Sequence, residues 1–439
     1  MTTNDSPTEI AIAFVGCLVP DESGSRNAAF SQAGQMYQSE LLLGLRSAGL
    51  LPSIILSIIP IPAYPKSPRI WITSDKSRLV GGVRVRFLPF LNITPLKQVT
   101  IGLSTVWELL KWGWRSRHAS FRAVYSYNLS VPPGLFTLIG ARCIGARALV
   151  SLCDINVPGE TVPAGLAWRL DYWLHRKLIP RFDGHVVASE ATASDFLPGR
   201  PYVLLEGGIG NELLDRTGDV NRRCDTSSEC FVVSTAGRLD ESNGILTVLR
   251  AFAQLEGGQY RLRIAGTGPF EALVREAALA DPRIEYLGLI SFDDVLKLYS
   301  SSHVLVNMRM TKTLNTRYFF PSKMMEYLAS GTPVITTSAG HIEKEFGNFV
   351  YLLESETSEA LANTIRLVAS QDAQHRQEMG QKARTYMRTH KMWQMQTQRV
   401  AQYIRQTVLG IESASAEGQT LPQRVQIAKG SAAELKTPG

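Results

Sequence analysis

An arginine beside a glycine, directly after an apolar run, is the first feature of this sequence that could do chemistry. Gly237 and Arg238 follow residues 230–235, whose apolar side chains predict a buried strand. Glycine lets a backbone approach a ligand, and a guanidinium offers a fixed fork of donors that matches phosphate oxygens. The pair predicts a phosphate contact, and a strand-end turn with a surface arginine is the alternative.

A second glycine turn follows the next predicted strand. Gly266 and Gly268 stand between an apolar run at residues 261–265 and a helical pattern at residues 270–280. Two glycines in this position resemble a dinucleotide fingerprint, but Glu271 occupies the place of its third glycine. A tight turn of this kind needs no cofactor, so by itself it slightly favours a structural role.

A third segment combines a helix start with an acidic residue. Ser322 can cap a helix that begins near Lys323, and the free N–H groups of its first turn, which includes Met324, form an anion site. Glu326 lies one turn further along. Its carboxylate can accept hydrogen bonds from ribose hydroxyls, or it can simply complement the helix dipole.

Strands and helices must alternate to position these residues. Apolar runs at residues 10–17, 53–59, 83–88, 123–127, 148–152, 184–188 and 202–205 predict the strands of a first parallel sheet. The pattern restarts with predicted strands at residues 230–235, 261–265, 284–287, 304–307 and 333–337. Alternation of this kind is typical of α/β domains.

The 439 residues exceed the size of a single core. We predict a first domain at residues 1–210, a polar linker at 211–229 and a second domain at 230–385. A helix at residues 386–410 and a disordered tail at 411–439 complete the prediction. Residues 1–8 lack the features of a signal peptide, and the apolar stretch at residues 50–63 is too short to span a membrane.

Charge and cysteine content restrict the classes of function. The net charge is +7, and residues 1–205 carry all of it, which favours an anionic partner such as a membrane, a nucleic acid or a phosphorylated substrate. The five cysteines form no CxxC pair, which excludes a zinc ribbon and fits a reducing cytoplasm. The histidines show no metal-ligand spacing, and no Asp-x-Asp occurs, so we expect no metal site.

Residues 103–122 combine tryptophans with cations. The tryptophans are Trp107, Trp112 and Trp114, and the cations are Lys111, Arg115, Arg117 and Arg122. Four apolar residues stand at helical spacing: Leu103, Trp107, Leu110 and Trp114. On a helix the four apolar residues would share one face, which suits a membrane interface with tryptophan at the headgroups. The same face could instead pack on the first sheet and leave the cations solvated, and the sequence leaves both interpretations open.

Together, these motifs resemble the retaining, GT-B-fold glycosyltransferases of family 4, the glycosyltransferase group 1 type. The resemblance covers about residues 231–370, where order and spacing agree. Its members are Gly237-Arg238, Gly266-Thr267-Gly268-Pro269, Tyr286-Leu287-Gly288, and Glu326 followed by Gly331-Thr332-Pro333-Val334. It implies an α/β fold of two Rossmann-like domains that face each other across a cleft, with a C-terminal helix crossing back to the first.

The resemblance also implies a reaction and its site. A hexosyl group would move from a nucleotide-diphosphate sugar to a saccharide or lipid-linked acceptor with retention, without a metal or other cofactor. The implied catalytic residues are Arg238 and Glu326. The implied donor-binding residues are Gly34, Gly237, Arg238, Asn243, Gly266, Gly268, Gly288, Ser322, Lys323, Met324 and Glu326, and the acceptor-side candidates are Ala33, Cys153 and Asp154. We expect no nucleic-acid partner, and we expect the cytoplasm, at the inner face of the cell membrane, as the location.

Three positions depart from the family pattern. Tyr318 stands where the family has the first glutamate of E-x7-E, and Cys153 stands where it has a histidine. Asn243 replaces the phosphate-binding lysine, for which Lys323 and Lys312 are candidate substitutes. These departures keep two alternatives open: a non-catalytic subunit that binds a nucleotide sugar or a partner, and a GT-B-type sugar-nucleotide epimerase that acts on the donor alone.

Overall fold

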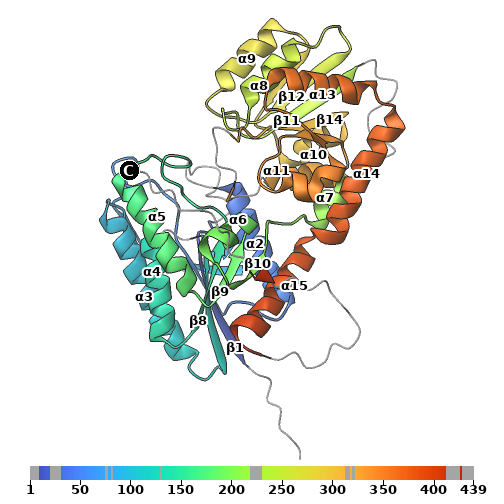
Figure 1. Cartoon of the computed structure of the whole chain (residues 1–439). Coiled ribbons are helices and arrows are strands. Elements are labelled where there is room, and N and C mark those ends of the chain that lie inside the picture. Colours follow the sequence, from blue (N-terminus) through green and yellow to red (C-terminus); the bar gives the residue numbers. More distant parts are fainter. Residues whose placement is uncertain are drawn as a thin grey trace, which may run out of the picture. The chain divides into compact units, whose positions relative to one another are not determined.

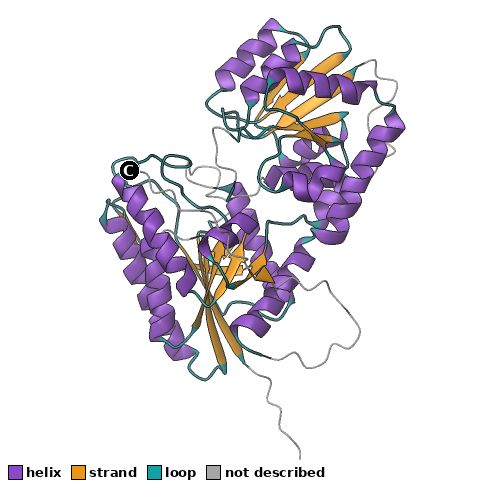
Figure 2. Cartoon of the chain, viewed as in Figure 1, coloured by secondary structure: helices purple, strands orange, loops and turns teal. Residues whose placement is uncertain are grey.

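The computed structural model describes residues 9–19, 31–74, 78–80, 83–128, 131–217, 230–311, 317–318, 322–411 and 426–427. The chain forms two compact units. Unit 1 comprises residues 1–206 and 393–439, and unit 2 comprises residues 207–392. Each unit is an α/β structure in which helices cover a sheet (Figure 2), so the predicted fold class is confirmed.

Unit 1 contains a sheet with the strand order β17-β10-β9-β8-β7-β1-β2-β5-β4. The strands are β1 (Ile10–Gly16), β2 (Ile54–Ser57), β4 (Arg78–Val80), β5 (Val83–Phe87), β7 (Phe121–Tyr127), β8 (Arg147–Leu152), β9 (Gly184–Val187), β10 (Pro201–Leu204) and β17 (Gln426–Ile427). Pairing is parallel except for β4 and β17, which lie antiparallel to β5 and β10. Central strand β1 is apolar along its whole length because both of its faces are buried. A separate pair joins β3 (Trp71–Ile72) to β6 (Phe90–Leu91).

Helices α2 (Gln32–Ser47), α3 (Leu96–Arg115), α4 (Val131–Cys143), α5 (Leu166–Leu178), α6 (Glu190–Phe196) and α15 (Trp393–Tyr403) complete unit 1. The chain returns to this unit with α15. The Trp393 ring packs edge-on against Tyr37 of α2 at 5.6 Å, and Val400 is buried in the same core as Leu41. The Tyr403 hydroxyl donates to the carbonyl of Pro201, which ties α15 to β10. A C-terminal helix therefore belongs to the first unit, as the resemblance implied.

Helix α3 turns two of its tryptophans, Trp107 and Trp114, away from the sheet. Its buried side includes Ile101, Leu109 and Trp112. The opposite side carries an exposed apolar stripe, the α3 stripe, formed by Leu96, Val99, Leu103, Trp107, Leu110 and Trp114. The predicted shared face is confirmed, and the interpretation in which that face packs on the sheet is wrong, because a different side of the helix does so. No helix in the described part of the chain is long and apolar enough to cross a bilayer.

Helices α3 and α4 touch along a seam of glycines. A Cβ atom on Gly102 would lie 2.0 Å from the Phe136 ring, and one on Gly113 would lie 2.4 Å from Ile144 Cγ2. From the other helix, a Cβ atom on Gly140 would lie 2.8 Å from Leu109 Cδ1. Side chains of the facing segment therefore occupy the space that these Cβ atoms would need, and glycine allows the close packing of α3 and α4.

Unit 2 contains an all-parallel sheet with the strand order β13-β12-β11-β14-β15-β16. The strands are β11 (Phe231–Ala236), β12 (Tyr260–Ala265), β13 (Ile284–Gly288), β14 (Val304–Asn307), β15 (Val334–Thr336) and β16 (Tyr351–Leu352). The helices are α7 (Asn211–Arg216), α8 (Ile245–Ala253), α9 (Glu271–Ala280), α10 (Phe292–Ser300), α11 (Ser322–Ser330), α12 (Ile342–Phe346), α13 (Ser358–Ser370) and α14 (Ala373–His390). The first five strands were predicted, whereas β16 is only two residues long and was missed.

Three segments differ from the predicted domain organisation. The stretch predicted as a linker, residues 211–229, begins with helix α7, which buries Leu213 and Leu214. Residues 218–229 of this stretch lie outside the described part of the structure. The predicted helix at 386–410 comprises the end of α14, all of α15 and a wider turn at Ile404–Val408. The predicted tail lies outside the described residues except for residue 411 and strand β17.

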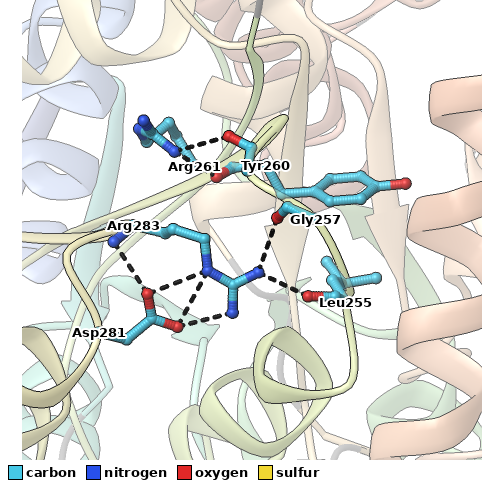
Figure 3. Close-up of polar contacts among 7 residues, drawn as sticks. Leu255, Gly257, Tyr260, Arg261, Asp281 and Arg283 are labelled. Atoms are coloured by element: carbon cyan, nitrogen blue, oxygen red, sulfur yellow. Dashed lines mark hydrogen bonds and ion pairs between the residues drawn. The ribbon is translucent and has the colours of Figure 1, made fainter.

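A cluster of hydrogen bonds around Arg283 connects two turns at the amino ends of strands β12 and β13 in unit 2 (Figure 3). Arg283 precedes β13, and its guanidinium pairs with Asp281 at 2.7 Å and donates to the carbonyl of Leu255 at 2.6 Å. A further bond reaches the carbonyl of Gly257. Hydrogen bonds from Arg283 lower the pKa of the Asp281 carboxyl. This cluster joins the turn after α8 to the turn before β13, at the end of the sheet opposite the carboxyl ends of the strands.

Candidate active site

The glycine motifs meet at the carboxyl ends of three neighbouring strands. The N–H of Gly237, after β11, donates to the carbonyl of Ala265 at 2.9 Å. The N–H of Gly266, after β12, donates to the carbonyl of Gly288 at 2.7 Å. These bonds continue the hydrogen-bond ladder of the sheet into the loops, so motifs that are far apart in sequence lie side by side.

Glycine is required at two of these positions because the loops are in contact. A Cβ atom on Gly266 would lie 1.8 Å from the carbonyl oxygen of Gly237, and the φ angle of Gly266 is +133°. A Cβ atom on Gly268 would lie 2.4 Å from the carbonyl oxygen of Leu239. A side chain at either position would push the β12 loop away from the β11 loop.

A cavity of about 280 Å³ opens at the carboxyl ends of β11 and β14. Its lining consists of Thr235, Ala236, Gly237, Arg238, Leu239, Asp240, Ser242, Asn243, Ile245, Val306, Asn307, Met308, Arg309, Lys323 and Tyr327. In open α/β sheets ligands bind outside the carboxyl ends of the strands, and polar groups from several loops converge here. The cavity is the candidate active site of unit 2.

Asp240 organises the loop that carries Arg238. One carboxylate oxygen accepts from Arg238 Nε at 3.0 Å, and the other accepts from Ser242 Oγ at 2.9 Å and from the N–H of Asn243 at 3.0 Å. Burial alone would raise the pKa of Asp240, but the hydrogen bonds from Ser242 and Asn243 and the charge of Arg238 lower it overall. The carboxylate therefore stays ionised and holds Arg238 at the rim of the cavity.

Asn243 takes part in the same network. Its side-chain amide donates to Asp240 Oδ1 at 2.6 Å. At the position where the family pattern has a lysine, the Asn243 side chain therefore stabilises the conformation of the loop through Asp240 and supplies no charge. A direct contact between Asn243 and the donor stays a prediction.

We expect Asp240→Asn to weaken donor binding by loosening Arg238. Loss of hydrogen bonds to a charged group typically costs about 1–3 kcal/mol. Since the pKa of Asp240 is lowered in the folded protein, its stabilising effect is present above the unfolded pKa of about 3.9 and is lost as the pH falls through the folded value. The difference between wild type and variant in urea unfolding should be largest at pH 7 and should shrink as the pH falls below the unfolded pKa and through the folded pKa of Asp240. A difference that does not change with pH would contradict this role.

Arg309 is a second cation in the cavity, and the sequence analysis missed it. It follows β14, where its N–H donates to Thr337 Oγ1 at 3.0 Å and its carbonyl accepts from the same hydroxyl at 3.0 Å. Its Nε atom is buried and has no hydrogen-bond partner among the described residues. Burial lowers the pKa of Arg309, and the charge of Asp240 acts in the opposite direction.

The signal for Arg309 was present in the sequence. An arginine directly after a buried strand singled out Arg238, and Arg309 follows residues 304–308 in the same way. No glycine precedes it, and the flanking Met308 and Met310 are typical of core packing. Only the parallel pairing of β11 with β14 shows that the two arginines reach one cavity.

Helix α11 carries the acidic residue of the third motif. Glu326 Oε2 accepts from the Tyr299 hydroxyl at 3.0 Å and pairs with Lys323 Nζ at 3.2 Å. The Tyr327 hydroxyl bonds both the N–H and the carbonyl of Ala236, which fixes α11 against the end of β11. Burial raises the pKa of Tyr327 to about 12, so it stays a neutral donor.

The remaining α11 residues are placed as follows. The helix begins at Ser322, one residue earlier than predicted, and the side chain of Ser322 lies outside the described part of the structure. The Met324 side chain is fully buried, so only its backbone could serve a ligand. Lys323 lines the cavity, whereas Lys312, the other candidate substitute cation, lies outside the described residues.

The predicted site residues of unit 1, donor-binding Gly34 and the acceptor-side candidates Cys153 and Asp154, lie near the carboxyl ends of β7 and β8. Gly34 donates its N–H to Ser31 Oγ at 3.1 Å, and a Cβ atom at this position would lie 3.1 Å from the Tyr127 hydroxyl. Burial raises the pKa values of the Cys153 thiol and the Asp154 carboxyl. Because the pKa of the Cys153 thiol is raised, the thiol stays protonated at neutral pH and is not a ready nucleophile.

Two neighbours complete this group. Asn128 Nδ2 donates to Asp154 Oδ2 at 3.1 Å, and Asn128 Oδ1 accepts from the N–H of Asp154 at 3.2 Å. Tyr127 hydrogen-bonds with Cys153 and shares its buried surroundings. Sequence reasoning missed both Asn128 and Tyr127 because neither belongs to a recognisable motif. Ala33 is exposed at the start of α2.

Comparison with known protein families identifies the second unit. Residues 230–371 match the family model described as Glycosyl transferases group 1. Unit 2 contains a group 1 glycosyltransferase domain. The match spans the same residues that carried the resemblance in the sequence, so the resemblance is confirmed there. No curated protein matches the sequence.

Solved structures extend the likeness to both units of the chain. Sucrose-phosphate synthase from Thermosynechococcus elongatus is 18% identical, with a TM-score of 0.64, and the match covers 91% of this chain and 100% of that one. HepE from Anabaena in complex with UDP and glucose is 16% identical, with a TM-score of 0.60 over 90% and 98% of the two chains. Trehalose 6-phosphate synthase from Burkholderia multivorans is 12% identical, with a TM-score of 0.63 over 90% and 97%. At these identities the likeness shows the GT-B fold.

The glycosyltransferase domain brings most of the predicted donor residues together. Gly237, Arg238, Asn243 and Lys323 line the cavity, and Gly266, Gly268 and Gly288 form the adjoining loops. Glu326 and Met324 lie on α11, which borders the cavity through Lys323 and Tyr327. Gly34, Ala33, Cys153 and Asp154 belong to unit 1. The role of each residue in binding or catalysis stays a prediction.

Proposed function

We propose that this protein transfers a hexosyl group from a nucleotide-diphosphate sugar to a saccharide or lipid-linked acceptor, with retention and without a metal. One observation carries the donor side of the proposal: Arg238 and Arg309 meet in a single cavity of a glycosyltransferase domain. Guanidinium groups match phosphate oxygens, and Arg309 Nε has no hydrogen-bond partner among the described residues. A bound diphosphate would supply that partner.

The charge that the chain itself provides supports the proposed metal independence. The departing nucleoside diphosphate is an anion, and its departure requires fixed positive groups or dipoles aimed at the developing charge. Arg238, Arg309 and Lys323 line the cavity and can supply that stabilisation. Glu326, beside Lys323, is proposed to accept hydrogen bonds from the ribose hydroxyls.

The compared structures support a nucleotide sugar as the donor. HepE from Anabaena has been solved with UDP and glucose and also with UDP-glucose. On the acceptor side, residues 1–205 carry the whole net charge of +7, which favours an anionic acceptor or surface. We propose that the acceptor is an intermediate of polysaccharide synthesis, used in the cytoplasm at the inner face of the cell membrane.

Two alternatives predict different products. A GT-B-type epimerase would change the donor sugar without any acceptor, and a non-catalytic subunit would bind the donor without turnover. A thermal-shift screen of UDP-, GDP-, ADP- and dTDP-sugars identifies the donor first, because a ligand at 100 times its Kd adds about 2.7 kcal/mol to the stability of the folded protein.

The decisive measurement is transfer by the wild-type protein in excess EDTA, with the anomeric configuration of the product read by proton NMR. We expect turnover with a retained configuration and at least about a 100-fold slower reaction for Arg238→Ala. An inverted product contradicts the proposed stereochemistry, and activity that returns only with Mn²⁺ contradicts metal independence. Binding without turnover in the presence of candidate acceptors favours the non-catalytic alternative.

A further inference from the structure

Three neighbouring helices of unit 1 share an exposed apolar face that the transfer reaction does not use. Helices α3, α4 and α5 lie side by side, and α4 packs against both of the others (Figure 1). The α3 stripe runs along a helix of 20 residues, and its Trp107 and Trp114 are 62% and 69% exposed. On α4, Leu135 and Ile139 are exposed one turn apart, while Leu138 is buried.

Helix α5 extends this face, although no pattern in the sequence singled it out. Leu166, Leu170 and Trp173 are 84%, 54% and 54% exposed. They stand at positions i, i+4 and i+7, which places them on one side of the helix. The buried residues of α5, His175 and Leu178, lie on its other side. We call the exposed sides of α3, α4 and α5 the three-helix face.

Positive charge predominates on the three helices, although Arg142 of α4 is paired with Asp183. The three helices contain seven lysine and arginine residues and two acidic residues. One of the acids, Glu108, is buried and already pairs with Arg86 and Lys111. Lys111 Nζ lies 5.5 Å from the Trp107 ring, and the Arg117 guanidinium lies 4.7 Å from the Trp114 ring.

We infer that the three-helix face docks unit 1 on an anionic lipid bilayer. An apolar patch with cations at its edge matches the layers of such a surface, where acyl chains lie below anionic headgroups. Tryptophan beside lysine or arginine is typical of the headgroup level. A second copy of the chain fits this face less well, because a symmetric contact would bring two sets of cations together.

This inference rests on the proposed location at a membrane and names the surface that would bind it, but it does not require transfer. The experiment uses the full chain without donor or acceptor, in flotation with phosphatidylcholine liposomes of rising phosphatidylglycerol content. Binding should increase with phosphatidylglycerol and fall with salt. Arg169→Gln with Lys177→Gln on α5 should weaken binding by roughly five-fold for each cation, and Leu170→Gln with Trp173→Gln by at least ten-fold.

Leu279→Gln with Leu289→Gln is the matched control, because both leucines are exposed in unit 2 and lie outside the three-helix face. It should bind liposomes like the wild type. Circular dichroism melts confirm that every variant is folded. Wild-type binding by both α5 variants would overturn the inference. Light scattering that shows a dimer, converted to a monomer by the α5 variants, with no liposome binding, would assign the face to a second copy of the chain.

Discussion

Arg309→Met should slow sugar transfer by about 100- to 1,000-fold while leaving the free protein at least as stable as the wild type. The rate falls because one fixed donor to the departing diphosphate is lost, and such donors typically contribute this much. Stability is preserved because a largely buried guanidinium whose Nε has no hydrogen-bond partner among the described residues costs free energy in the absence of a ligand. Methionine has a similar length and fills the same space.

Two measurements separate a role in transfer from a role in folding. The first is kcat and kcat/KM of wild type, Arg309→Met and Arg309→Lys, in which lysine keeps the charge but loses the fork of donors. The second is the melting temperature with and without nucleoside diphosphate, which should rise with ligand for the wild type and hardly at all for Arg309→Met. Arg275→Met is the control, because Arg275 is an exposed residue of α9 outside the cavity. A variant that melts earlier but retains donor affinity would make Arg309 a structural residue.

Gly266→Ala should both destabilise unit 2 and abolish donor binding. The new methyl group would meet the carbonyl oxygen of Gly237 at 1.8 Å, and alanine disfavours a φ angle of +133°. Backbone in such a region costs about 1–3 kcal/mol before the clash is counted, so we expect a loss of roughly 3 kcal/mol or more. The β11 loop would move, and with it Arg238.

Gly258→Ala provides the matched control for this substitution. Gly258 also lies in a loop of unit 2, and a Cβ atom there would meet nothing within 4 Å. Thermal melts should show a decrease of several degrees for Gly266→Ala and almost none for Gly258→Ala. The nucleotide thermal shift should disappear only in the first variant. Equal melting temperatures for the two variants would show that the loops can separate without consequence.

The sequence predicted the strands of unit 2 well because buried parallel strands are continuous apolar runs. Residues 261–265 and 304–307 were placed within one residue of β12 and β14 for this reason. Short edge elements such as β16 carry too few residues for a pattern. Helix α7 was hidden because Leu213 and Leu214 are its only apolar residues in a polar stretch.

The chemistry of the site was predictable only where it is local in sequence. The glycine turns and the α11 motif could be recognised because each is a continuous segment. The sequence showed that Asn243 removes a cation, but it could not show that Asp240 accepts the amide or that Arg309 reaches the same cavity. Those relations depend on which strands lie next to each other.

The glycine seam between α3 and α4 determines how unit 1 could meet a lipid surface. Many amphipathic segments become helical only on contact with lipid, and the cost of ordering the chain then reduces their affinity. Here Gly102, Gly113 and Gly140 let the two helices pack closely against each other in the free protein, before any contact with lipid. Trp107 and Trp114 are therefore presented on helices that are already folded and packed. We expect such a surface to suit a flat membrane better than a tightly curved one and to bind without any gain of helix.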